Sequence, residues 1–243
     1  FAFGWDNFSR LTKTSLAFMP LIISLALVSW AILASKKSFV VREGFSVFNI
    51  LSVGAAIALI SQIYHVPGEF DRFLLAWMLL SVPLVYLLSS TLAAVSYLIG
   101  ISFWAANAQN LGGNAILFWP LAGAVIPYFW KHLSADRFSM SSLWLSFAIC
   151  VSLSVGMGVS LEKVVPGLWV IVYSAFFAAL YLAGKLWFDD GEGFWQRPFR
   201  NYGMAGLVVL SYIFTFRWVW ADVGWRYYRA GWGFQTEAGY MDY

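Results

Sequence analysis

The sequence predicts an all-α fold, a polytopic integral membrane bundle of about eight transmembrane helices. Of its 243 residues, 61% are hydrophobic and 11% are charged, whereas soluble domains devote about a quarter of their residues to charge. Apolar runs also follow one another along the whole chain, with no polar interval large enough for a separate domain. We therefore expect a single transmembrane domain over residues 1–243.

The elements of this bundle are predicted from the length of the apolar runs. A helix needs about 20 mainly apolar residues to cross a hydrocarbon layer of roughly 30 Å. Runs of this kind, bounded by charge, glycine or proline, cover residues 16–34, 44–64, 73–89, 91–108, 115–130, 142–159, 165–186 and 202–220. The third and fourth runs meet at Ser89 and Ser90 without a charge, so a tight hairpin and one long bent helix both remain open. The fifth run is short.

The two ends of the chain differ from the bundle. Residues 1–13 mix aromatic and charged side chains and predict an interfacial approach to the bundle, which we place at 14–220. Residues 221–243 predict an aromatic interfacial tail. The chain begins at Phe1 without methionine and without the pattern of a signal peptide. We therefore expect a missing N-terminal region before Phe1.

The distribution of Lys and Arg predicts the orientation, because short cytoplasmic loops are enriched in these residues. If all eight runs cross, one edge receives Lys36, Lys37, Arg42, Lys131, Arg137, Lys185, Arg197 and Arg200. The other edge receives Arg10, Lys13, Arg72 and Lys163, and the tail adds Arg217, Arg226 and Arg229. Without the tail, the first edge is favoured by eight to four. We expect that edge in the cytoplasm and Phe1 outside.

The most polar segment between two runs covers residues 61–72, and it yields a candidate polar site at the outer face. With Asn107, which follows the fourth run on the same face, the candidate residues are Ser61, Gln62, Tyr64, His65, Glu69, Asp71, Arg72 and Asn107. In one interpretation, His65 exchanges a proton or binds a ligand while Glu69 and its neighbours close over it. In the other, the segment is a capped turn and Asn107 belongs to an ordinary glycine-containing loop.

The sequence shows no pattern typical of metal binding, catalysis, nucleic-acid binding or proton-driven transport. His65 and His132 are the only histidines and are predicted near opposite faces, and Cys150 is the only cysteine. We therefore expect no metal, no cofactor and no catalytic residue, and we interpret Cys150 as a packing residue. The basic residues are scattered instead of clustered, so nucleic acid is not an expected partner. No charge lies in the centre of a run, which disfavours proton-driven transport.

The aromatic tail yields a candidate partner or lipid interface. Its residues are Trp218, Trp220, Trp225, Arg226, Tyr227, Tyr228, Arg229 and Trp232. Indole rings and guanidinium groups suit the lipid headgroup region, and they are also enriched where membrane subunits dock. Membrane lipids and another integral membrane subunit are therefore the two expected partners.

Two segments resemble a known family. Gly4-Trp5-Asp6-Asn7, and above all Ile60-Ser61-Gln62-Ile63-Tyr64-His65-Val66-Pro67-Gly68-Glu69-Phe70-Asp71 followed by Leu74-Leu75-Ala76-Trp77, are similar to bacterial predicted membrane proteins called domain of unknown function 2157. The resemblance runs from Phe1 to about Trp104. It implies a small soluble region and an earlier membrane helix before Phe1, and it implies no particular activity.

We therefore expect a non-enzymatic, multi-pass protein of the bacterial cytoplasmic (inner) membrane that serves as an accessory, scaffold or sensory subunit of a membrane assembly. The alternative is a transporter or channel for a small neutral or weakly polar solute, with Gln62, Tyr64, His65 and Asn107 in an outer vestibule. An intramembrane enzyme that uses His65 and Glu69 is a third interpretation.

Overall fold

The structure, a computed structural model, describes residues 8–33, 38–66, 68–110, 115–164, 169–216 and 219. These residues form helices and turns, and no strand occurs among them. The helices are α2 (Arg10–Leu33), α3 (Phe39–Tyr64), α4 (Phe70–Leu87), α5 (Thr91–Asn110), the short 3-10 helix η1 (Ala115–Leu117), α6 (Phe118–Gly123), α7 (Ile126–Ala135), α8 (Met140–Val164), α9 (Trp169–Phe188) and α10 (Pro198–Ile213). The predicted all-α class is confirmed.

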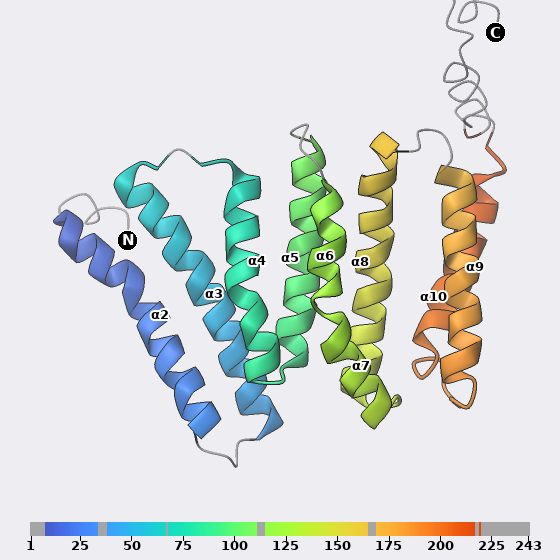
Figure 1. The fold of residues 1–243 in the computed structure, drawn as a ribbon, viewed down its shortest axis with the longest axis horizontal. Helices are drawn as coiled ribbons and strands as arrows, with labels where there is room; N and C mark the ends of the chain where they lie inside the picture. Colours follow the sequence, from blue (N-terminus) through green and yellow to red (C-terminus); the bar gives the residue numbers. More distant parts are fainter. Residues whose placement is uncertain are drawn as a thin grey trace, which may run out of the picture.

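The helices stand side by side and run alternately in opposite directions (Figure 1). Within the described ranges, six are long and apolar enough to cross a membrane: α2, α3, α4, α5, α8 and α9. α10 has 16 residues. The chain is therefore a helical membrane protein, with the six long helices and α10 lying where seven of the eight apolar runs predicted them.

The fifth run, residues 115–130, differs from the single helix that we expected. It folds as η1, α6 and α7, with a break at Ala124 and Val125. Pro127 lies in the first turn of α7 and has no backbone N–H to continue the bonding of α6. Two tyrosines bond carbonyl groups at this break: Tyr97 Oη donates to Leu121 O at 3.0 Å, and Tyr86 Oη donates to Ala124 O.

The connection between the third and fourth runs is a tight hairpin. α4 ends at Leu87 and α5 begins at Thr91, with Ser89 in a left-handed conformation at φ 46°. The alternative of one long bent helix is thus excluded. This sharp turn places Ser90 and Thr91 beside the first turns of α3.

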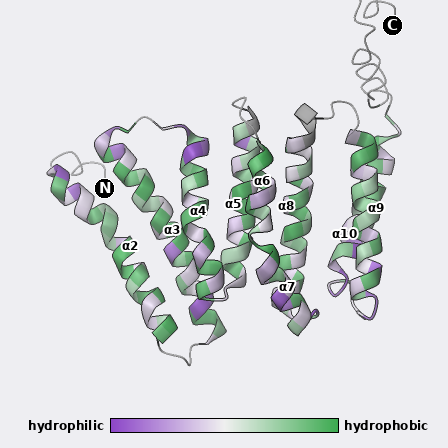
Figure 2. Ribbon diagram, in the orientation of Figure 1, coloured by the Kyte–Doolittle hydropathy of each residue, from purple (hydrophilic) through white to green (hydrophobic). Residues whose placement is uncertain are grey.

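The helices pack in an open row that follows the order of the chain. α2 packs chiefly on α3, and α5 packs on α4 and α8 in the middle of the row. At the far end α10 packs on α8, and α9 packs chiefly on α10. Many large apolar side chains of these helices are exposed, so the outer faces are hydrophobic. Figure 2 shows that hydrophobic residues occur along the length of the helices. Lipid is the solvent that suits such faces.

The core of the row lies around α5. Tyr97, Ile101 and Ala105 of α5 are buried, together with Phe118 of α6 and Cys150 of α8. Burial of Cys150 agrees with the packing role expected for the only cysteine. Of the helices long enough to cross a membrane, α5 is half buried, whereas α9 is only 11% buried over its most apolar window. The ends of the row therefore present far more of their surface to lipid than its centre does.

Candidate functional site

The most unusual polar feature of the structure is a buried carboxylate on α3. Glu43 is 4% exposed and lies in the second turn of α3. Its Oε1 accepts a hydrogen bond from Thr91 N at 2.8 Å, and its Oε2 accepts one from Leu92 N at 2.8 Å and one from Ser90 Oγ at 2.5 Å. Both oxygens of the carboxylate are thus bound to the beginning of α5.

Together, Glu43 and Ser90 satisfy the N-terminus of α5. The first four N–H groups of a helix have no partner within it. Two of them, on Thr91 and Leu92, donate to Glu43, while Ala93 N donates to Ser90 Oγ at 3.1 Å and Ala94 N to Ser90 O at 3.3 Å. The negative charge also stands at the positive end of the helix dipole. Glu43 therefore acts as a cap that ties α3 to the α4–α5 hairpin.

Tyr128 and His132 interact electrostatically with this carboxylate. Tyr128 Oη lies 3.5 Å from Thr91 Oγ1, and the ring of Tyr128 lies 4.6 Å from that of His132 in the last turn of α7. Burial lowers the pKa of His132, the positive charge of Lys131 lowers it further, and Glu43 acts in the opposite direction. The cluster thus joins α3, α5 and α7 at the edge that carries most of the loop cations.

The sequence did not point to Glu43 because the second run was predicted to begin one residue later, at Gly44. Its burial depends on the α4–α5 hairpin, which the sequence left open. One signal was available: the α5 helix begins after Ser89-Ser90 with no acidic residue in its first turn. An acidic residue elsewhere was therefore needed if that helix end was to meet a negative charge.

Glu43 also begins a row of buried polar side chains along α3. Ser46, Asn49 and Ser52 follow at intervals of three residues, and all are buried. Ser46 Oγ lies 2.6 Å from Ser90 Oγ, and Asn49 Nδ2 donates to Ser24 Oγ of α2 at 2.9 Å. Such hydrogen bonds between helices stabilise packing inside a membrane.

The predicted outer-face residues lie at the opposite edge. His65 ends α3 in a left-handed conformation with φ 51° and is exposed, and its backbone N–H bonds Ser61 O. Ser61 Oγ donates to Val66 O at 3.2 Å. Arg72 forms an exposed ion pair with Glu69 at 3.2 Å. These contacts are those of a capped turn, and the ligand-binding interpretation stays a prediction.

The other predicted residues of this face are Gln62, Tyr64, Asp71 and Asn107. Gln62 is exposed, and Tyr64 Oη lies 3.2 Å from Thr14 Oγ1 of α2. Asp71 and Asn107 are both partly buried. Asn107 lies near the end of α5, at the same edge as the α3–α4 turn (Figure 1), and its Nδ2 is buried without a hydrogen-bond partner among the described residues.

The described part of the chain contains neither the predicted aromatic interface nor a metal-binding cluster. Trp218, Trp220, Trp225, Arg226, Tyr227, Tyr228, Arg229 and Trp232 lie outside the described residues. Within the described ranges, no group of three or more His, Cys, Asp or Glu side chains is placed to hold a metal ion.

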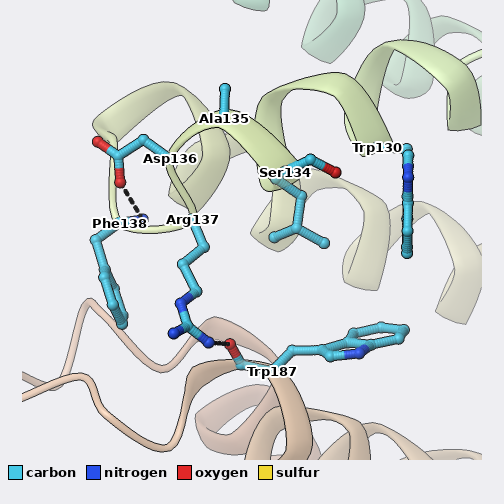
Figure 3. Close-up of a pocket in the computed structure, with 8 residues that line it drawn as sticks. Trp130, Ser134, Ala135, Asp136, Arg137, Phe138 and Trp187 are labelled. Carbon is cyan, nitrogen blue, oxygen red and sulfur yellow. Dashed lines mark hydrogen bonds between the residues drawn. The ribbon is translucent and has the colours of Figure 1, made fainter.

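A pocket of about 630 Å³ lies at the cytoplasm-predicted edge, between the α7–α8 turn and the end of α9 (Figure 3). Trp130 and Trp187 line it, together with Asp136 and Arg137 from the turn. Arg137 Nη1 donates to Trp187 O and Arg137 Nη2 to Asp190 Oδ2, each at 3.0 Å. The sequence assigned Arg137 only to orientation and did not point to this pocket.

The fold and these sites define a multi-pass α-helical membrane protein. Residues 1–94 match the model of the family described as Predicted membrane protein (DUF2157). The match covers α2, α3, α4 and the first turn of α5, and it confirms the resemblance seen around His65. Comparisons with curated proteins and with solved structures gave no match.

Proposed function

We propose that the protein is a non-enzymatic accessory, scaffold or sensory subunit of an assembly in the bacterial cytoplasmic membrane. The observation that carries this proposal is the open row of helices, in which α2 and α9 each pack chiefly on one neighbour. A closed bundle surrounds a central site or path with helices. An open row instead offers the outer faces of its two end helices to other membrane proteins.

The side chains on these end helices support the proposal. In α2, only Ala17, Ser24, Val28 and Ala31 are buried, and Ile22 is 65% exposed. In α9, Leu182 is 58% exposed. Both outer faces are apolar, so lipid and a partner helix are alternative neighbours for them.

The buried polar groups support the same role. The Glu43 carboxylate accepts three hydrogen bonds from the α4–α5 hairpin and the start of α5, and Asn49 is bonded to Ser24. These groups bond one helix to another and so hold the row together. Glu43 and His132 are both ionisable, so their cluster also suits a sensory role.

Crosslinking from the end helices tests the proposal. In a Cys150→Ser background, cysteine at Ile22 or Leu182 carries a photoreactive maleimide, and the buried position Ala105 is the control. We expect irradiation of intact membranes to give a protein adduct of one discrete mass from Ile22 or Leu182 and none from Ala105. A chain that gives lipid adducts only, and that is monomeric without a co-purifying protein in mild detergent, would overturn the proposal.

A second candidate function is movement of a small neutral solute, which the polar row on α3 favours. Glu43, Ser46, Asn49 and Ser52 extend from one edge towards the centre of α3. Uptake of small neutral solutes into proteoliposomes tests this candidate. Transport that Asn49→Leu abolishes would favour it over the accessory role, and an absence of uptake in the wild type would oppose it.

A further inference from the structure

The pocket between the α7–α8 turn and the end of α9 has two chemically different ends. Trp130 and Leu133 of α7 and Trp187 of α9 form its apolar part, whereas Asp136 and Arg137 form its charged part. Figure 3 shows the two indole rings on one side and the charged turn on the other. The pocket is therefore amphipathic.

The polarity of the pocket follows the direction of α7. Trp130 lies five residues before the end of α7, which corresponds to about 7.5 Å along a helix. Asp136 and Arg137 follow that end, so Trp130 lies farther from this edge along α7 than the charged turn does, whereas Trp187 lies in the last turn of α9 beside that turn. Tryptophan and arginine near the ends of membrane helices are typical of the boundary between acyl chains and headgroups. An amphiphile inserted like the surrounding lipids would match both ends.

The charged end is held in place and carries both signs. Arg137 is fixed by its bonds to Trp187 O and Asp190, and its guanidinium carbon lies 5.4 Å from the centre of the Phe138 ring. Its side chain is still 44% exposed. Asp136 lines the pocket with Arg137, and Asp190, next to the lining, forms an ion pair with Arg137, so one positive and two negative groups lie at the charged end. This balance favours a headgroup that itself carries both charges over one that is only anionic.

We propose that this pocket binds one glycerophospholipid whose headgroup contains a phosphate and a primary ammonium. The phosphate lies against the guanidinium of Arg137, and the ammonium faces the carboxylates of Asp136 and Asp190. The glycerol and the first acyl carbons lie between Trp130 and Trp187. Arginine suits the phosphate because a guanidinium has five N–H donors in one plane, and the bonds to Trp187 O and Asp190 use only two of them.

Native mass spectrometry of the full chain in mild detergent tests this assignment. Phosphatidylethanolamine, phosphatidylglycerol and phosphatidylcholine with identical acyl chains are titrated separately. We expect the tightest binding, at one molecule per chain, for phosphatidylethanolamine, because it alone combines a phosphate with hydrogen-bonding ammonium protons. Equal binding of the three lipids, or tighter binding of phosphatidylglycerol, would overturn the proposal.

Variants distinguish the pocket from general lipid adhesion. Arg137→Gln is expected to weaken phosphatidylethanolamine binding by about tenfold, the loss of one charge-assisted contact. Trp130→Ala is expected to weaken it as well. Arg72→Gln, at the opposite edge, and Trp144→Ala, an exposed indole outside the pocket, are matched controls that should bind as the wild type does.

A second set of variants keeps the test decisive if Arg137→Gln fails to fold. Thermal unfolding without added lipid identifies that failure, and Arg137→Lys then retains the charge but loses the fork. Arg137→Lys and Trp130→Ala should both bind phosphatidylethanolamine more weakly than wild type. Unchanged binding in these two folded variants would overturn the proposal.

Discussion

At the scale of single residues, Glu43 shows how one carboxylate can hold two helices together. Its two oxygens receive the first two N–H groups of α5, so Glu43→Gln leaves one N–H facing an amide NH₂ group. An unsatisfied buried donor costs about 1–3 kcal/mol. We expect this variant to lower the free energy of unfolding in detergent by about that amount.

The matched control for Glu43→Gln is Glu69→Gln. Glu69 is exposed and forms an exposed ion pair with Arg72, and such pairs contribute about 0–1 kcal/mol. Its unfolding should stay close to that of the wild type. Equal stability of the two variants would show that the cap on α5 is dispensable.

A pH-dependent contribution from His132 is also expected. Its pKa is lowered in the folded protein, chiefly by burial and then by Lys131. The unfolded chain therefore binds the proton more readily, so this contribution to stability is present above pH 6.5, the usual histidine value, and is lost as pH falls below it. The melting temperature should fall less for His132→Gln than for wild type between about pH 7.5 and about pH 5.

His65→Gln is the matched control for this comparison. His65 is exposed at the opposite edge and lies outside the cluster around Glu43. Its melting temperature should follow the wild-type pH dependence. If His132→Gln did the same, the contribution assigned to His132 would be absent.

The sequence predicted the turn around His65 as polar but did not predict the buried site at Glu43. Polarity between two apolar runs is visible locally, because it depends only on residues 61–72. Burial of Glu43 depends on a contact across 48 residues with Thr91. The apolar pattern of α3 contains no information about what α5 places beside it.

At the scale of elements, α9 and α10 approach each other closely. A Cβ added at Gly203 of α10 would lie 2.6 Å from Phe177 O and 2.6 Å from Tyr181 N, both backbone atoms of α9. Small residues allow such close approach between membrane helices. Gly203→Ala should therefore lower the free energy of unfolding by about 1–3 kcal/mol, the usual cost of overpacking, as measured by thermal unfolding in detergent.

Gly44→Ala provides the control, because a Cβ there would meet no described atom within 4 Å. Gly44 lies inside α3, where alanine is the better helix former by about 1 kcal/mol. This variant should be as stable as the wild type or slightly more stable. A neutral Gly203→Ala would contradict the close packing of α9 on α10.

Most elements could be predicted from the length of their apolar runs, and the exceptions have local causes. Each long helix needs only a continuous apolar stretch. The fifth run is also apolar, but Pro127 prevents continuous bonding from α6 into α7. Tyr86 and Tyr97 stabilise the break by donating hydrogen bonds to its carbonyl groups, and both are distant from it in the sequence.

At the scale of the whole molecule, the helices that were predicted separately pack in one open row. Hydropathy predicts crossing segments but not their neighbours, since every apolar face suits lipid and another helix alike. The order of packing, the exposed faces of α2 and α9, and the pocket at Arg137 therefore had to come from the structure. The accessory role and the lipid site both depend on this arrangement.

The most direct test of this membrane arrangement is the side from which two positions can be labelled. Three crossing segments separate Glu69 from Ser134: α4, α5 and the broken segment over residues 115–130. In a Cys150→Ser background, an impermeant maleimide should label Glu69→Cys in intact cells, and Ser134→Cys only after permeabilisation. Labelling of both positions from the same side would contradict the alternating row, and the reverse pattern would contradict its orientation.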